Sequence, residues 1–220
     1  MRNGFYRGIV LASLAALAAL SPVRASEGFP DPSTGIEHSA TKGRQVAVLA
    51  GGCFWCTEGV MEQLIGVNHV ISGYSGGDAN GAHYEIVGSG KTNHAESIEI
   101  TFDSSKISYG EILKVFFSVA HDPTTKDYQG PDHGRQYRSA IFYKTPEQKS
   151  IAEAYIKQLD EGKIFPRPIV TEVTPLVKFY PAEEYHQDFI RNNPNHPYVI
   201  ANYRPKLAKL KQYYPAMLKK

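Results

Sequence analysis

The chain of 220 residues contains two cysteines, Cys53 and Cys56, spaced three positions apart directly after the glycine pair Gly51-Gly52. Where a helix begins at such a point, unpaired backbone N–H groups and the positive end of the helix dipole stabilise a thiolate in its first turn. Because the thiolate is the reactive form of cysteine, this placement predicts a nucleophile at Cys53. Cys56 would lie one helical turn away, within reach of a sulfenic acid or a mixed disulfide on Cys53.

Two aromatic residues, Phe54 and Trp55, stand between the cysteines. Each ring on its own has core packing as an equally good explanation. Two exposed rings beside a nucleophile would instead form a pocket for a small apolar group such as a methyl. A strand, a Cys-x-x-Cys pair and a helix in this order are also typical of thioredoxins. Thioredoxins, however, have small or rigid residues between the cysteines and a cis-proline loop soon after, and here no proline occurs between Cys56 and Pro123.

A structural disulfide is the usual state of two cysteines in an exported protein. Here such a bridge would close a very small loop and would remove little entropy from the unfolded chain. A domain of this size also has a sufficient core without one. The placement therefore favours a redox or nucleophilic role, and a non-catalytic exported binding module with a structural Cys53–Cys56 bridge is the alternative.

The first 25 residues have the composition of a signal peptide. Arg2 and Arg7 form a basic start, residues 9–20 are apolar or small, and Val23-x-Ala25 offers small residues at the cleavage-determining positions. The apolar run is too short to span a bilayer comfortably. We expect a cleaved secretory signal and hence a periplasmic or secreted protein, with an uncleaved membrane anchor as the alternative.

The charge of the chain is close to balanced once the signal is removed. The formal net charge of +2 includes three arginines of the first 25 residues, which contain no acid, so 21 of the 24 Lys+Arg remain against 22 Asp+Glu. This balance gives no indication of a nucleic-acid partner. We expect a monomer without stable insertion in a membrane after cleavage.

Strand-like and helix-like segments alternate after residue 43. Strands are expected over 45–50, 67–74, 97–102, 139–143 and 169–173, and helices over 55–64, 108–120, 146–160 and 182–190. The alternation of polar and apolar residues over 97–102 predicts a strand buried on one face. Residues 77–94 and 121–137 are expected to be loops.

The order of these elements, βαββαβ and then αβα, indicates the α+β class. It is typical of a two-layer sandwich with a ferredoxin-like, split-βαβ core and C-terminal additions. We divide the chain into a signal peptide (1–25), a flexible lead-in (26–43), a catalytic domain (44–200) and a basic tail (201–220). The tail has six lysines and arginines from Arg204 onward and no acid, and a solvated end is the simplest expectation.

Further motifs follow the cysteine pair in order. They are Tyr84, Gly90-x-x-x-His94-Ala95-Glu96, His121-Asp122-Pro123, Gly130-x-Asp132-His133-Gly134-x-Gln136-Tyr137-Arg138-Ser139 and Tyr185-His186-Gln187. Together with Gly51-Gly52-Cys53-Phe54-Trp55, these motifs resemble the A-type peptide methionine sulfoxide reductases. The resemblance extends from about residue 45 to residue 190, and the Gly-Cys-Phe-Trp signature with the Asp-His-Gly block is highly specific to that family.

The resemblance implies a role for each residue of the signature. The first cysteine, Cys53, would attack the sulfoxide sulfur, become a sulfenic acid and release methionine. Phe54 and Trp55 would hold the ε-methyl group of the substrate. Many members of the family have a recycling cysteine in a C-terminal tail, and this chain has none there. Cys56 is then the candidate resolving residue. A disulfide requires Cα atoms within about 7 Å and a specific torsion, so we expect the helix start to unwind locally when the two sulfurs bond.

The resemblance also implies a proton donor. Glu96, Tyr84 and Tyr137 would hydrogen-bond the sulfoxide oxygen and deliver its proton, and Asp132 would orient the site. A carboxylic acid with a raised pKa suits this task, and a carboxyl group desolvated by the Phe/Trp pocket would have one. Without the resemblance, Glu96 would be assigned to a strand edge, the two tyrosines to packing and Asp132 to a turn.

The implied activity is the reduction of methionine-S-sulfoxide, free or within oxidised exported proteins. The resemblance implies no bound cofactor, with a thioredoxin-like protein or dithiothreitol as the reductant. His94, His121, His133 and His186 match no zinc-ligand spacing, so structural hydrogen bonding is their expected role. The alternative enzyme is an exported thiol–disulfide oxidoreductase that uses the Cys53–Cys56 pair.

Overall fold

A six-stranded sheet organises the chain, with the strands in the order β7-β6-β1-β3-β2-β8. The structure is a computed structural model that describes residues 1, 28–40 and 43–220, so the expected signal peptide, apart from Met1, lies outside the described residues. The strands are β1 (Arg44–Gly51), β2 (Val67–Ser75), β3 (Ala95–Asp103), β6 (Ser139–Tyr143), β7 (Glu172–Pro175) and β8 (Phe179–Pro181). Neighbouring strands are antiparallel, except that β6 and β7 are parallel.

The first four expected strands are confirmed, and the expected last strand begins at Glu172 and is followed by β8. The prediction that residues 97–102 have one buried face is wrong. Ser97 and Thr101 are buried as well as Ile98 and Ile100. The reason is position: β3 is paired on both sides and a second apolar cluster covers the far face of the sheet.

The described residues form four longer helices. They are α1 (Phe54–Glu62), α3 (Tyr109–Val115), α4 (Pro146–Glu161) and α6 (Arg204–Tyr213). The first three lie where helices are expected, and α6 lies in the segment expected to be a solvated tail. The Ser108 hydroxyl accepts from the Glu111 N–H and the Glu111 carboxylate accepts from the Ser108 N–H, which completes a capping box at α3. The helix expected to reach Ala120 does so, but its last turn, Phe116–Ala120, is a π-helix.

The expected loops contain short elements. Region 77–94 includes a 3-10 turn (Ala79–Gly81) and α2 (Tyr84–Gly88), and region 121–137 includes β4 (Tyr128–Gln129), β5 (Asp132–His133) and a 3-10 turn (Arg135–Tyr137). The helix expected over 182–190 is a 3-10 turn (Glu184–His186) followed by α5 (Phe189–Asn192), and Pro181 ends β8 instead of opening a helix. Single turns of this kind have no periodic apolar pattern, so the sequence does not reveal them.

The main core lies between the sheet and the helices. The alternate residues Ala47 and Leu49 of β1 face it, together with Ile98, Ile100 and Phe102 of β3. Their neighbours Val48 and Ala50 face the opposite side, where the second cluster also includes Ala95, Ala140 and Phe142. Because successive side chains of a strand point to opposite faces, the same strands contribute apolar residues to both faces of the sheet.

The N-terminal segment 28–40 is not the flexible lead-in that we expected. The Tyr155 hydroxyl of α4 donates to the Pro30 carbonyl over 2.7 Å, and the Gly110 N–H of α3 donates to the Gly35 carbonyl over 2.8 Å. Lys114 forms an ion pair with Asp31 at 2.6 Å. The two helices on which this segment lies thus satisfy part of its polar backbone and hold it in place.

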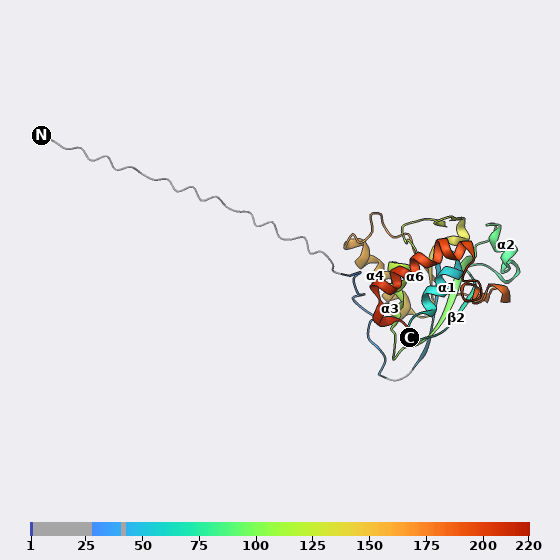
Figure 1. The fold of residues 1–220 in the computed structure, drawn as a ribbon, viewed down its shortest axis with the longest axis horizontal. Helices are drawn as coiled ribbons and strands as arrows, with labels where there is room; N and C mark the ends of the chain where they lie inside the picture. The colour runs from blue at the N-terminus through green and yellow to red at the C-terminus, as the bar shows by residue number, and fades with distance from the viewer. Residues whose placement is uncertain (2–27, 41–42) are drawn as a thin grey trace.

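The basic C-terminal segment is also not a solvated end. Helix α6 packs against α1 and against the π-helical turn Phe116–Ala120, and Leu210 and Tyr214 are buried (Figure 1). After a 3-10 turn (Pro215–Met217), the Ile65 N–H donates to the Met217 carbonyl over 2.8 Å. The sequence did not predict this packing, because the segment is rich in lysine and α6 has only a short apolar stripe. Within the described part of the chain, no helix is long and apolar enough to cross a membrane.

Gly52 joins β1 to α1 in a conformation that favours glycine. Its φ is +84°, and a Cβ atom added there would lie 2.6 Å from both Cβ and Cγ of Gln129. The Gln129 side-chain oxygen accepts from the Asp122 N–H over 3.0 Å, so this side chain is fixed within the loop that leads to β5. The missing side chain at Gly52 is what allows that loop to lie against the start of α1.

We predict that Gly52→Ala lowers the free energy of unfolding by about 2–4 kcal/mol, through the positive φ and the overpacking against Gln129. Urea unfolding followed by circular dichroism measures the change. Gly88→Ala is the matched control, because nothing lies within 4 Å of a Cβ added at Gly88. Equal stability of the two variants would contradict the role of Gly52.

Candidate active site

Cys53 is the N-cap residue of α1, as the sequence predicted. The Cys56 N–H donates to the Cys53 carbonyl over 3.1 Å, so the first turn of the helix is formed between the two cysteines. Both residues are free thiols; Cys53 is half-buried and Cys56 is buried. The two thiols hydrogen-bond each other.

The expected stabilisation of a Cys53 thiolate by the helix start is wrong in direction. Burial raises the pKa of the Cys53 thiol well above its usual value, and the neighbouring Cys56 raises it further. The hydrogen bond from Cys53 in turn lowers the pKa of Cys56. At the helix start, the Phe54 N–H donates over 3.0 Å to Oε2 of Glu96. Desolvation of the Cys53 sulfur is the largest cause of the raised pKa and outweighs any effect of the helix start. The resting Cys53 is therefore a thiol.

A pocket of about 190 Å³ opens beside Cys53. Seven of the eight residues that the sequence singled out line it, and Cys56 does not. The lining residues are Cys53, Phe54, Trp55, Tyr84, Glu96, Asp132, Tyr137 and Tyr198. They come from α1, α2, β3, β5, the 3-10 turn after β5 and the C-terminal segment, so the fold brings together residues from across the chain.

The aromatic wall of the pocket is held rigidly. Trp55 stacks on Phe189 with ring centroids 3.7 Å apart and an interplanar angle of 7°. The Trp55 indole N–H donates over 3.1 Å to Nδ1 of His186, whose pKa burial lowers, so the imidazole is neutral and accepts. Phe54 is 1% exposed and belongs to the core as well as to the pocket, so both explanations of this ring hold.

Glu96 is the buried acid of the pocket. It is 2% exposed and lies on β3 opposite Tyr74 of β2. Burial raises the pKa of its carboxyl group well above the usual value, and the nearby Cys53 raises it further. A carboxyl group in this state retains its proton at neutral pH and can donate it.

Two tyrosines complete the polar side of the pocket. Burial raises the pKa of both Tyr84 and Tyr137, so their hydroxyl groups remain protonated donors. The Tyr84 N–H donates over 2.9 Å to Oε1 of Glu183, and the other oxygen of Glu183 accepts from the Tyr74 hydroxyl. The carboxylate of Glu183 thus ties the start of α2 to β2.

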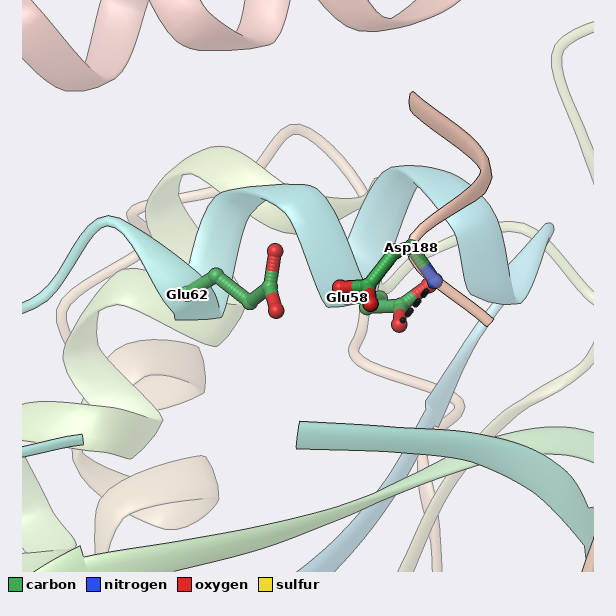
Figure 2. A group of neighbouring side chains, drawn as sticks. All are labelled: Glu58, Glu62 and Asp188. Carbon is green, nitrogen blue, oxygen red and sulfur yellow. Dashed lines mark hydrogen bonds between the residues drawn. The ribbon is translucent and has the colours of Figure 1, made fainter. Parts of the chain in front are cut away.

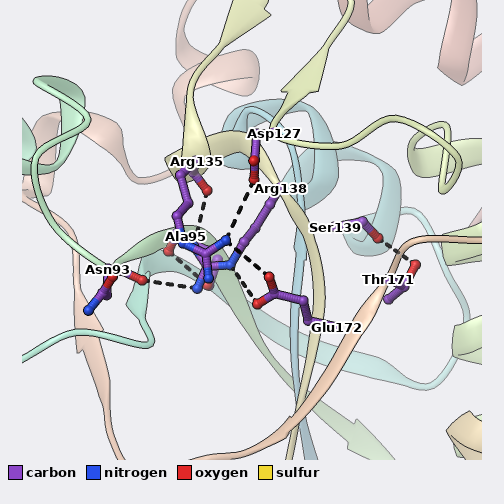
Figure 3. Close-up of polar contacts among 9 residues, drawn as sticks. Asn93, Ala95, Asp127, Arg135, Arg138, Ser139, Thr171 and Glu172 are labelled. Atoms are coloured by element: carbon purple, nitrogen blue, oxygen red, sulfur yellow. Dashed lines mark hydrogen bonds and ion pairs between the residues drawn. The ribbon is translucent and has the colours of Figure 1, made fainter.

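Arg138 connects two segments of the chain, the one before Glu96 and the one that contains Tyr137. Its guanidinium donates to the Asn93 carbonyl over 2.9 Å and to the Arg135 carbonyl over 3.0 Å, and its Nε donates to Oε2 of Glu172 over 3.0 Å (Figure 3). Arg138 is 5% exposed, so these hydrogen bonds lie in a largely desolvated region. Because its N–H donors have charged or carbonyl acceptors, Arg138 holds the attached segments in fixed positions.

Tyr198 is a pocket residue that the sequence did not reveal. Its hydroxyl donates to Oδ2 of Asp132 over 2.5 Å and also hydrogen-bonds the cysteines. It is one of 14 tyrosines and lies outside every motif, so the sequence gave no signal for it. His186 and Phe189 were likewise not assigned to the site, although the Tyr185-His186-Gln187 motif pointed to their neighbourhood. The structural role expected for the histidines is seen at His186 and at His121, which hydrogen-bonds Ser139 over 2.7 Å.

A second cavity of about 330 Å³ also borders the cysteines. Both Cys53 and Cys56 line it, together with Lys206 and Lys209 of α6. The region 121–132 contributes His121, Asp122, Gln129, Gly130, Pro131 and Asp132. Asp132 and Tyr198 line both cavities, so their hydrogen-bonded side chains stand between them. Cys53 is thus accessible from two sides and Cys56 from one.

Three carboxyl groups gather on one face of α1, where Glu58 and Glu62 of this helix meet Asp188 (Figure 2). Oε1 of Glu58 accepts from the Asp188 N–H and Oε2 accepts from the Ser72 hydroxyl, each over 3.0 Å. Burial raises the pKa of Glu58 to about 7. The hydrogen bond to Asp188 holds the start of α5 on α1, and the next residue is the Phe189 that stacks on Trp55.

Comparison with known proteins agrees with this geometry. The family model described as peptide methionine sulfoxide reductase matches residues 45–217. The relative named peptide methionine sulfoxide reductase MsrA 2 of Synechocystis is 54% identical over 196 residues, covering 88% of this chain and 92% of the relative. The MsrA 2 of Mesorhizobium japonicum is 52% identical over 182 residues, covering 83% and 93%.

The solved structures give the same result. Methionine sulfoxide reductase A of Corynebacterium diphtheriae superposes with a TM-score of 0.62 at 29% identity, covering 80% of this chain and 92% of that one. The reduced form of Mxr1 from Saccharomyces cerevisiae superposes with a TM-score of 0.62 at 30% identity, covering 73% and 91%. The α+β fold is shared with these proteins. The chain therefore belongs to the peptide methionine sulfoxide reductase A family.

Proposed function

We propose that this protein reduces methionine-S-sulfoxide, free and within proteins, with Cys53 as the nucleophile and Cys56 as the resolving residue. One observation supports this above the others. A thiol, two fixed aromatic rings and a buried protonated carboxyl group line the same pocket of about 190 Å³. A thioredoxin-like protein, or dithiothreitol in the laboratory, is the proposed reductant, and no bound cofactor takes part.

The pocket suits each part of a methyl sulfoxide. The apolar methyl group lies against Phe54 and Trp55, and the oxygen accepts hydrogen bonds from Glu96, Tyr84 and Tyr137. Glu96 protonates the oxygen while the Cys53 sulfur attacks the sulfoxide sulfur, and the proton of the Cys53 thiol returns to the Glu96 carboxylate. The oxygen passes to Cys53, which becomes a sulfenic acid, and the thioether methionine is released. Cys56 then displaces the hydroxyl group as water and forms a disulfide, which the reductant opens.

The strand order supports a finer assignment of the fold. We infer that β1, α1, β2, β3, α3 and β6 form a ferredoxin-like, split-βαβ core. The order β6-β1-β3-β2 with antiparallel neighbours is the arrangement typical of such a core. The strands β7 and β8 extend it at its two edges.

The cysteine assignments predict different failures in the two single variants. Cys53→Ser is expected to release no methionine, because the attacking sulfur is gone. Cys56→Ser is expected to release one methionine per enzyme and then to accumulate the sulfenic acid, because the resolving thiol is gone. Chromatography of methionine from the separated sulfoxide epimers, with and without dithiothreitol or thioredoxin, measures both effects.

Three results would contradict these assignments. Unchanged sulfoxide with the wild-type protein and dithiothreitol would reject the enzyme activity itself. Full activity of Cys53→Ser would reject the nucleophile. Normal thioredoxin-dependent cycling of Cys56→Ser would mean that the reductant acts on Cys53 directly. Reduction of insulin without any sulfoxide activity would instead support a thiol–disulfide oxidoreductase.

The role of Glu96 as proton donor predicts a specific pH dependence. The protonated form is the active one, so the rate falls as the pH rises through the raised pKa of Glu96. Glu96→Gln is expected to lower kcat by about 10²- to 10⁴-fold and to remove this alkaline fall. Glu99→Gln is the control, since Glu99 lies on the same strand at a position three residues on. An unchanged pH profile in Glu96→Gln would show that the proton comes from another group.

We also propose that the protein is exported and repairs oxidised proteins outside the cytoplasm. The basic start, the apolar run 9–20 and the small residues Val23 and Ala25 support this proposal. The full-length chain expressed in a bacterial host is expected to appear in the periplasmic fraction with a new N-terminus near Ser26. Mass spectrometry of the intact protein measures this. An uncleaved chain in the membrane fraction would support the anchor, and an uncleaved soluble chain would reject export.

A further inference from the structure

Two cations line the cavity that contains Cys56. The basic side chains among its lining residues are Lys206, Lys209 and His121. His121 is neutral, because burial lowers its pKa to about 3. Lys206 and Lys209 therefore provide the positive charge of this cavity, and both come from α6.

Lys206 is the fixed member of this pair. It is half-buried, and its ammonium donates to the carbonyl of Ala120 at the end of the π-helical turn, whereas Lys209 is exposed. The charge of Lys206 acts on Cys56 and on Asp132. Helix α6 packs on α1, and this ammonium lines a cavity that includes Cys56, which does not line the Glu96 pocket.

We propose that Lys206 is a positioning residue for the resolving step, in which its fixed ammonium assists the attack of Cys56 on the Cys53 sulfenic acid. The inference rests on the proposed roles of the two cysteines. It also separates the two half-reactions in space. The sulfoxide reacts with Cys53 in the Glu96 pocket, and the disulfide forms toward the Lys206 cavity.

The step balances within the protein. The thiolate sulfur of Cys56 forms a bond to the Cys53 sulfur while the S–O bond of the sulfenic acid breaks. The proton lost by the Cys56 thiol combines with the departing hydroxide, and the resulting water leaves through the cavity. The two sulfurs share the oxidation that the sulfoxide brought in, so no further oxidant is needed. A nearby cation favours the thiolate, which is the attacking form.

The pH dependence of this step involves every charged or titratable group that faces Cys56. On α1 this is Cys53. The loop between the π-helical turn and β6 contributes His121, Asp122 and Asp132. The C-terminal segment contributes Tyr198, Tyr203, Lys206 and Lys209. The hydrogen bond from Cys53 is the largest cause that lowers the pKa of Cys56. Among the charged side chains, Lys206 lowers this pKa and Asp132 raises it, so loss of the lysine raises it.

The test compares three variants in a single turnover without reductant. Lys206→Gln keeps a hydrogen-bond donor but loses the charge, Lys206→Arg keeps the charge, and Lys211→Met changes an exposed lysine of the same helix. Each protein is mixed with methionine sulfoxide, the released methionine is counted by chromatography, and the sulfenic acid is trapped with dimedone over time. The decay of the trapped species gives the rate of resolution across a range of pH.

We expect resolution in Lys206→Gln to be about three- to tenfold slower near neutral pH, with its midpoint about half to one pH unit higher. Lys206→Arg and Lys211→Met should resolve like the wild type. Resolution of Lys206→Gln at the wild-type rate and with the wild-type pH profile would overturn the inference. So would an equal loss in Lys206→Arg, since that would indicate packing and not charge. If the wild-type protein releases no methionine, the proposed function itself fails.

Discussion

The hydrogen bond from the Phe54 N–H to the Glu96 carboxyl group is the interaction on which the site depends. The first N–H groups of a helix have no partner within the helix, and here a buried carboxyl group of β3 accepts one of them. This contact joins the residue after the nucleophile to the proposed acid. Cys53 itself rests as a thiol because burial raises the pKa of its sulfur.

A thiol at rest is compatible with reduction of a sulfoxide. The reaction needs both a proton on the oxygen and a nucleophilic sulfur, and the pocket stores the proton on Glu96 and on the tyrosine hydroxyl groups. Desolvation raises all of these pKa values for the same physical reason, which is the cost of placing a charge in a buried site. At rest, the Cys53 thiol, the Glu96 carboxyl group and the two tyrosine hydroxyl groups are thus all favoured in their neutral forms.

The supporting shell consists of segments that are distant in sequence. Arg138 ties the segment before Glu96 to the segment with Tyr137, and Glu183 ties α2 to β2. Glu58 holds the chain at Asp188, which places Phe189 on Trp55. Because these hydrogen bonds are largely buried, each partner would be left unsatisfied if its mate moved, and this penalty keeps the pocket in shape. Tyr198, which precedes the π-helical turn Val199–Tyr203, and Lys206 of α6 both line the cavity that contains Cys56.

The sequence by itself determined the reactive residues and the main elements. A thiol next to two rings, the strand and helix periodicities, Ser108 before a helix and Pro146 in the first turn of another are local signals, because they depend on neighbours within a few residues. The motifs also identified the seven pocket residues from Cys53 to Tyr137. The tertiary structure alone decided the rest. The burial of both faces of β3, the packing of residues 28–40 and of α6, and the positions of Tyr198, Phe189 and Lys206 arise from contacts between distant segments. The protonation of Cys53 was decided there too, because desolvation depends on everything that surrounds the sulfur and the local sequence specifies only the helix start.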